Sequence, residues 1–172
     1  MEQADPKQDS LGQTSKSDAF VSSILKKMES STACGAALRR ADNQATEYQA
    51  WEYLATWCDI EKPWERLRYA VVSAALARAK PARDGVLPLG EALARCYENG
   101  TRDAARAKLR RLLACDSIEE VCAILRPLLS LIISRGCRIS FARLLDDLSF
   151  FPTHGERIKA RWASQFFHTE GE

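Results

Sequence analysis

Basic side chains are the groups in this sequence whose type and spacing could do chemistry. Between Arg66 and Arg111 there are eleven Lys or Arg residues against four Asp or Glu, although the whole chain carries a formal net charge of only +2. Positive charge concentrated in the middle of a chain can form a stripe that faces a polyanion. Arginine-rich helices also occur simply because charge keeps a helical surface solvated. The composition leaves both interpretations open.

The acidic and nucleophilic residues do not form a recognisable catalytic pattern. Asp146 and Asp147 are adjacent, so on a helix their side chains diverge by about 100° and are poor partners for one metal ion or one substrate. We expect both at the surface. His154 follows Thr153 at a predicted helix start, where a capping or surface role is more common than general-base catalysis. The sequence also lacks the glycine-rich loops that bind nucleotide phosphates. We therefore predict that the protein is not an enzyme.

The cysteines and the apolar segments limit the classes of protein to which the chain can belong. The six cysteines include no C-x-x-C pair and mostly fall inside helical apolar patterns, so we expect reduced core residues, with no metal and no cofactor. No apolar run reaches the roughly 20 residues needed to cross a bilayer. Residues 1–20 lack the layout of a signal peptide. We expect a cytoplasmic protein that does not contact membranes.

Three successive helices must position the basic residues of the middle of the chain. Apolar residues recur at the spacing of one buried helical face in each, and the first helix leaves Arg106, Lys108, Arg110 and Arg111 off that face. The three predicted faces consist of Ala105, Leu109, Leu112 and Leu113; of Ile118, Val121, Cys122, Leu125, Leu129, Ile132 and Ile133; and of Phe141, Leu144, Leu145 and Leu148.

No strand pattern of convincing length occurs, so the fold class is predicted to be all-α, a compact bundle of about seven to nine helices. Residues 1–15 are expected to be a disordered tail and residues 16–172 one helical domain, with a candidate break between two lobes near 81–89, where Pro and Gly cluster. The nearly all-apolar helix that opens at Pro63 should lie at the centre of the bundle. The aromatic residues of 46–57 are predicted to face the core.

Helix boundaries follow from local signals. Asp18 is a predicted N-cap; Ser117 and Thr153 are predicted to open helices as capping boxes with Glu120 and Glu156. Gly100 and Gly136 are predicted to end helices. Pro127 should kink a helix without starting a new element. The last helix should bury Ile158, Trp162 and Phe166 and leave Arg157, Lys159 and Arg161 toward solvent.

The order of several segments along the chain resembles the CasB family, the small subunit of the type I-E CRISPR surveillance complex Cascade. The segments are CGAALRRA (34–41), LGEALARCYENG (89–100), LRRLLACDS (109–117), LRPLLSLIISRG (125–136), ISFARLLDDLSFF (139–151) and RIKARWASQFF (157–167). The sequence departs from the family pattern at Phe141 and at Phe150–Phe151, where tryptophan is frequent, and at Glu91, where arginine is frequent.

This resemblance implies a non-catalytic subunit that binds nucleic-acid backbone and stabilises the R-loop, formed by guide RNA and target DNA, together with the displaced strand. The implied partners are the guide RNA, the target and non-target DNA strands, the Cascade backbone and large subunits, and a second copy of the chain. Arginine suits the task because its planar donors match phosphate oxygens whatever the base. The phosphate contacts expected on this basis are Arg39, Arg40, Arg106, Lys108, Arg110, Arg111, Arg135, Arg138 and Arg143.

A helical adaptor is the alternative function. In that case the protein makes only protein–protein contacts, and its arginines pair with acidic residues of a partner. Binding to single-stranded DNA distinguishes the two, because a phosphate binder weakens steeply as salt rises whereas an adaptor has no such binding to lose.

Overall fold

The computed structural model describes residues 14–97 and 101–171. In these ranges the chain forms eight α-helices and one short 3₁₀-helix, and no strand, which confirms the predicted all-α class. The elements are α1 (Lys16–Ser30), α2 (Thr32–Leu38), η1 (Glu47–Ala50), α3 (Trp51–Leu54), α4 (Pro63–Ala79), α5 (Leu89–Arg95), α6 (Arg102–Leu113), α7 (Ile118–Ser134) and α8 (Phe141–Glu170). Residues 1–13 of the predicted tail and the predicted cap Gly100 lie outside the described residues.

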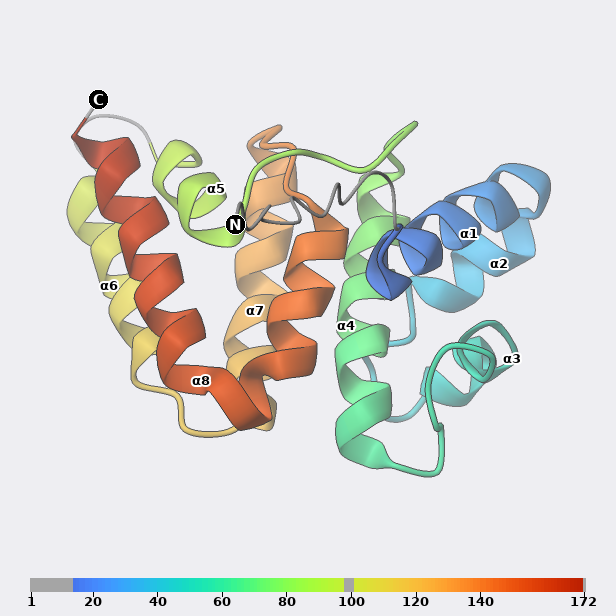
Figure 1. Ribbon diagram of the computed structural model, residues 1–172. Coiled ribbons are helices and arrows are strands. Elements are labelled where there is room, and N and C mark those ends of the chain that lie inside the picture. Colours follow the sequence, from blue (N-terminus) through green and yellow to red (C-terminus); the bar gives the residue numbers. More distant parts are fainter. Residues whose placement is uncertain (1–13, 98–100, 172) are drawn as a thin grey trace, which may run out of the picture.

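Helix α4 forms the centre of the bundle, as its composition predicts. Pro63 occupies its first turn, and every residue from 69 to 77 is buried. Helices α1, α2, α3, α7 and α8 all pack against it. Because Leu76 has no exposed surface, its truncation to alanine should cost about 2–5 kcal/mol of folding stability. Figure 1 shows α4 between the N-terminal helices and the α6, α7 and α8 group.

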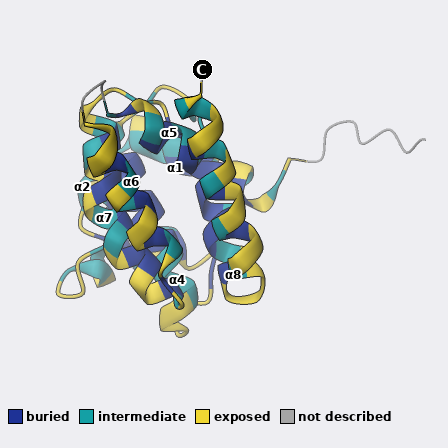
Figure 2. Cartoon of the chain, turned by 90° about the vertical axis from the view of Figure 1, so that its left-hand side faces the viewer, coloured by how far each residue is buried: buried dark blue, intermediate teal, exposed yellow. Residues whose placement is uncertain are grey.

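Helices α6, α7 and α8 bury the faces that the spacing predicts. All the predicted residues are buried except Leu113 and Ile133, which are half-buried. Figure 2 shows the buried surfaces turned inward and exposed residues on the outer faces of these helices. None of the described helices combines the length and the apolarity needed to span a membrane.

Helix α7 begins and ends with the predicted signals. The Ser117 hydroxyl accepts a hydrogen bond of 3.2 Å from the Glu120 amide, and the Glu120 carboxylate accepts from the Asp116 amide rather than from that of Ser117. The helix continues through Pro127 as one element. At its end Gly136 has a φ of 73°, and the amides of Gly136 and Cys137 donate to the carbonyls of Ile133 and Ile132. This is a Schellman cap, a turn that a side chain other than glycine would strain.

A last helical segment begins next to Thr153, as predicted, but without the predicted capping box, and it continues from the preceding helix across a kink. Helix α8 runs from Phe141 to Glu170, and His154 alone has non-helical dihedral angles (φ −131°, ψ 28°). The Thr153 hydroxyl donates to the Phe150 carbonyl instead of capping Glu156. Pro152, which has no amide hydrogen, weakens the helix at this point. The chain therefore bends sharply at His154, and the second half of α8 returns alongside α6 (Figure 1).

Two predictions about the N-terminal part are also corrected. Ser15, and not Asp18, is the N-cap of α1; Asp18 supplies the other half of the capping box, because its carboxylate accepts a hydrogen bond from the Ser15 amide. The segment 46–57, whose aromatic residues are predicted to face the core, forms two short helices, η1 and α3, and Tyr48 is 60% exposed. Ala50, Leu54 and Cys58 form the buried face there, and the half-buried Tyr53 and Trp57 pack against the core, so the predicted inward position of the aromatic residues is only partly confirmed.

Candidate nucleic-acid interface

Helix α6 presents the largest predicted group of cations. Ala105, Leu109 and Leu112 anchor it to the core, so its remaining sides face outward. Arg110 and Arg111 are exposed, and Lys108 is half-buried. The side chains of these three residues make no hydrogen bond or ion pair with the rest of the described chain. Their charges therefore remain available to an external anion.

Arg106, in contrast, has a partner within the chain. Its Nε and Nη2 donate to the carboxylate of Glu170 at 3.2 and 3.1 Å. The ion pair joins α6 to the last turn of α8, and the Glu170 side chain is only 11% exposed. Arg106 can reach a phosphate only by sharing its guanidinium or by releasing Glu170.

Lys108 and Arg111 lie at the edge of a groove between α6 and α7. The groove has a volume of about 180 Å³, and its floor is apolar. Ala123, Ile124, Pro127, Leu128 and Leu131 of α7 complete its lining, which contains no acidic residue from the described chain. A floor of this kind can pack against an apolar group or the apolar face of a sugar, while the two cations hold an adjacent anion.

A second predicted group gathers at the turn between α7 and α8. Arg135, Arg138 and Arg143 are exposed. The Nη1 of Arg143 donates a long hydrogen bond of 3.4 Å to the Val86 carbonyl, whereas the side chains of Arg135 and Arg138 have no hydrogen-bond or ion-pair partner in the described ranges. Arg135 is the C-cap of α7 and Arg143 lies in the first turn of α8, so all three cations lie near the same turn.

The loop between α4 and α5 fixes this second group in place. Leu87 pairs with Ile139 as an isolated parallel bridge, and the Arg138 carbonyl accepts from the amides of Val86 and Leu87. A Cβ on Gly85 would lie 2.2 Å from the carbonyl oxygens of Arg138 and Ile139, so only glycine allows this approach. The position of the Arg138 backbone therefore depends on the sequence of a loop more than 50 residues earlier.

Asp84 in the same loop caps helix α8. Its carboxylate accepts hydrogen bonds from the Phe141 and Ala142 amides at 2.8 and 3.1 Å and from the Ser140 hydroxyl at 3.1 Å. A carboxylate at a helix N-terminus satisfies unpaired amides and complements the helix dipole. Its neighbour Arg83 is exposed and makes no side-chain ion pair with the described residues. Arg83 is thus a further free cation beside the second group, and it was not among the nine predicted contacts.

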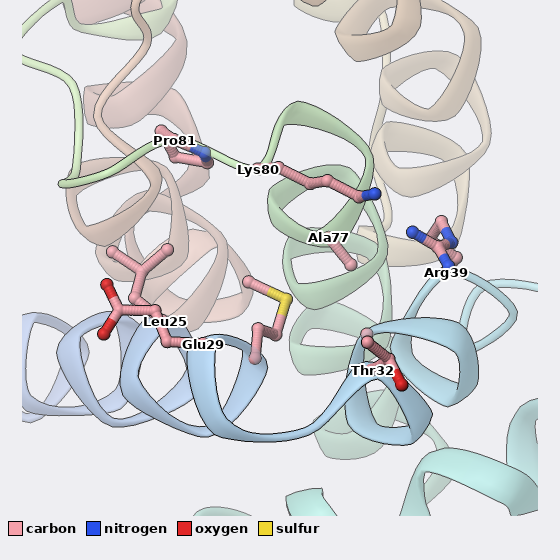
Figure 3. Close-up of a pocket in the computed structure, with 9 residues that line it drawn as sticks. Leu25, Glu29, Thr32, Arg39, Ala77, Lys80 and Pro81 are labelled. Carbon is pink, nitrogen blue, oxygen red and sulfur yellow. The ribbon is translucent and has the colours of Figure 1, made fainter.

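Arg39 and Arg40 follow α2 and behave differently from each other. The Arg40 Nη1 donates to the Gln49 amide oxygen at 3.2 Å, and its side chain is otherwise exposed. Arg39 lies at the rim of a cavity of about 240 Å³, together with Lys80. Figure 3 shows both cations on one side of this cavity and Glu29 on the other. Lys80 is a cation of the site that the sequence interpretation did not single out.

The nine predicted residues do not form one patch. The α6 group lies at one side of the bundle, and α2, with Arg39 and Arg40, lies at the other (Figure 1). The cavity at Arg39 and a smaller pocket at Arg138 adjoin each other, since Pro81 lines both. A long polymer could contact several of these positions at once, whereas a small ligand could contact only one.

The two adjacent aspartates of α8 and the nearby Lys159 make contacts within the fold. Asp147 is buried, which corrects its predicted surface position, and it accepts a hydrogen bond from Trp162 and pairs with Arg161. The Asp146 carboxylate accepts from the Ser17 hydroxyl. Lys159, predicted to face solvent, is mostly buried and pairs with Glu156 and Asp116. No cluster of potential metal ligands occurs among the described residues.

The cysteines lie in the core, as predicted. Five of the six are buried, and Cys137 is half-buried. Burial raises the pKa of the Cys58 and Cys96 thiols to about 11 and that of Cys122 to about 12. Thiols with such pKa values remain protonated at neutral pH, so they are poor nucleophiles.

Comparison with known proteins identifies the family. Three solved structures are similar to the chain. CasB from M. ruber is 26% identical, with a TM-score of 0.71 and coverage of 92% of this chain and 96% of that chain. A Cse2-family protein from Thermus thermophilus is 25% identical, with a TM-score of 0.70 and coverage of 88% and 97%. A chain of a CRISPR RNA-guided surveillance complex, 22% identical with a TM-score of 0.70 and coverage of 90% and 92%, shares the fold.

A search of the curated proteins found no match in sequence. The model of the family "CRISPR-associated protein Cse2" matches residues 35–167, which include α4 to α7 entirely and most of α2 and α8. The match covers well over half of the sequence and both groups of exposed cations. The chain therefore belongs to the CRISPR-associated Cse2 family, the family of CasB.

Proposed function

We propose that this chain is the small, non-catalytic subunit of a type I-E Cascade complex, in which it binds nucleic-acid backbone and stabilises the R-loop and the displaced strand. The family supports assembly into such a complex, because one similar chain comes from a CRISPR RNA-guided surveillance complex. In such complexes base pairing with the guide reads the sequence, so a small subunit has only to hold backbone.

The observation that carries the nucleic-acid part is the free charge on α6. Lys108, Arg110 and Arg111 occur within one turn of an exposed helical surface and have no acidic partner in the described part of the chain. Other arginines of this chain are held by acids, as Arg95 is by Glu91 and Arg78 by Asp42. A phosphate binds an unpaired cation with a more favourable free energy, because no internal ion pair has to be broken first.

The α7–α8 turn supplies the second part of the proposed surface. Arg135, Arg138 and Arg143 would contact the same polymer further along its backbone, and the bridge between Leu87 and Ile139 holds their turn rigid. Rigid cations lose less conformational entropy on binding than cations on a free loop. Arg39, Arg40 and Arg106 complete the nine proposed contacts, with smaller contributions where an internal partner competes.

The lifetime of the R-loop tests this proposal. Complexes are assembled with guide RNA and with the wild-type chain, Arg110→Ala/Arg111→Ala or the control Arg157→Ala. Arg157 is exposed, lies outside the proposed surface and has no side-chain partner among the described residues. We expect the double variant to shorten the R-loop lifetime about tenfold or more, as loss of two phosphate contacts implies. The control should leave the lifetime unchanged.

Circular dichroism and a melting curve establish that the double variant remains folded, because arginine stems also cover apolar surface. An R-loop lifetime equal to that of wild type, with the variant folded and incorporated, would contradict the nucleic-acid role. It would favour the adaptor function, in which the arginines pair with acidic residues of neighbouring subunits.

A further inference from the structure

The cavity between α1, α2 and the end of α4 has features that the proposed nucleic-acid role does not use. Leu25, Met28, Ala77 and Pro81 give it an apolar interior, and its volume is about 240 Å³. Met28 and Leu25 are only half-buried, so this apolar surface is open to solvent. Figure 3 shows the cavity with α1 and α2 on one side and the end of α4 on the other.

Two free cations lie at the rim of this cavity. Neither the Arg39 guanidinium nor the Lys80 ammonium makes a side-chain hydrogen bond or ion pair with the described residues. They lie on the same side of the cavity (Figure 3), where their like charges repel each other. Glu29 lines the opposite side and pairs with neither. An added carboxylate between the two cations would relieve this repulsion.

The backbone at Lys80 supports a role for its side chain. Lys80 ends α4 with φ 45° and ψ 48°, and it is the only described residue other than glycine with a positive φ. The left-handed conformation costs a residue with a Cβ about 1 kcal/mol or more, and glycine is the usual choice at such a cap. The protein is therefore less stable with lysine than with glycine at this position, which is consistent with a binding role for the ammonium group.

We propose that this cavity docks a segment of a neighbouring protein subunit, which inserts an apolar side chain between Met28 and Ala77 and places an adjacent carboxylate on Arg39 and Lys80. The inference rests on the proposed assembly of the chain into a multi-subunit complex. It goes beyond that proposal by adding a protein-docking site, and it revises the nine proposed phosphate contacts at one residue, because it assigns Arg39 to a protein contact.

The lining of the cavity favours a protein segment over a nucleotide. Among the described residues no aromatic side chain lines it, although proteins commonly hold unstacked bases by stacking them on aromatic rings. Aliphatic and thioether groups instead suit an aliphatic or aromatic side chain, and methionine adapts to partners of different shape. The paired cations then distinguish an acidic segment from a neutral one.

Three variants test the docking. Lys80→Gly removes the cation and also relieves the left-handed conformation; Arg39→Gln removes the other cation; Thr32→Trp places a bulky group at an exposed rim position. Lys26→Gln is the control, because Lys26 is an exposed lysine of α1 that does not line the cavity. The probe is the guide-RNA-loaded complex assembled without this chain, and the readout is the dissociation constant of labelled chain before target DNA is added.

We expect each of the three variants to dock about tenfold more weakly, the size of a moderate interface hot spot, and the control to dock as wild type does. The melting temperature of Lys80→Gly should be unchanged or up to about 3 °C higher. Higher stability together with weaker docking is not expected if Lys80 serves only as a helix cap.

Wild-type docking by all three variants would overturn the inference while leaving the proposed function intact. If these variants, as free proteins, also bind single-stranded DNA about tenfold more weakly, the cavity is a nucleic-acid contact instead. If wild-type chain itself does not dock to the complex, both the inference and the proposed assembly fail.

Discussion

The indole Nε1 of Trp162 donates a hydrogen bond of 2.7 Å to the carboxylate of Asp147, on the other side of the kink in α8. Arg161 adds an ion pair of 3.2 Å to the same carboxylate, and the Phe151 ring stacks on the Trp162 ring at 6.0 Å between centroids. The two halves of α8 are therefore fastened by polar contacts as well as by apolar packing. This fixes the direction in which the second half returns toward α6.

The buried carboxylate should make stability depend on pH. Burial raises the pKa of Asp147, and the hydrogen bond from Trp162 and the charge of Arg161 offset this only in part. An acid with a higher pKa in the folded state binds more protons when folded, so its stabilising contribution is present at low pH and is lost as pH rises through the folded-state pKa. We predict that wild type loses stability relative to Asp147→Asn as pH rises from about 4, the ordinary Asp value. Urea unfolding of both proteins across this range measures the difference; a difference independent of pH would contradict the prediction.

The salt dependence of binding to single-stranded DNA should show how many phosphate contacts α6 makes. Each phosphate contact to a single strand contributes about −0.7 to the slope of log K against log salt concentration. Arg110→Ala/Arg111→Ala should therefore make the slope for single-stranded DNA shallower by about 1.4. Fluorescence anisotropy at several salt concentrations measures it, with Arg157→Ala as the control. Equal slopes for wild type and the double variant would mean that neither arginine contacts phosphate.

The helical faces could be predicted from sequence because the signal is local. Burial of Leu109 or Leu125 follows from apolar neighbours one and two turns away, and the α7 boundaries follow from Ser117 and Gly136. The outward position of Arg110 and Arg111 on α6 could be predicted in the same way. Whether a cation of α6 is free to bind an external anion could not be predicted, because this depends on acidic partners that are distant in sequence. Arg106 is neutralised by Glu170, 64 residues later, whereas Arg110 has no partner in the described chain.

The errors have the same physical origin. Asp147 is expected at the surface because carboxylates usually are, but a tryptophan donor and an arginine from the next part of α8 make its burial tolerable. Lys80 lies next to the predicted break near 81–89, and only the fold places its ammonium group on the same cavity rim as Arg39. Pairs that are separated by tens of residues leave no periodic signal in one sequence.

Capping of α8 by Asp84 should be energetically important. Asp84→Ala removes the acceptor of two helix amides and the Ser140 hydroxyl, so we expect a loss of about 1–2 kcal/mol in the free energy of unfolding. Asp84→Asn, which keeps an acceptor, should lose less. Chemical denaturation of the two variants provides the comparison. If alanine costs no more than asparagine, the loop does not hold the start of α8 through this carboxylate.

The ion pair between Arg106 and Glu170 gives a prediction of opposite sign, a gain of binding. Glu170→Ala releases Arg106 and removes a negative charge beside the α6 cations, so the affinity for single-stranded DNA should rise about two- to fivefold at low salt, with one further phosphate contact in the salt slope. Stability should change by less than about 1 kcal/mol because the pair is partly exposed. The control is Glu156→Ala, which removes an acid from the same helix that pairs with Lys159 instead. Since both variants change the net charge equally, an equal gain for the control would assign the effect to overall charge rather than to Arg106, and no gain in either would exclude Arg106 from the interface.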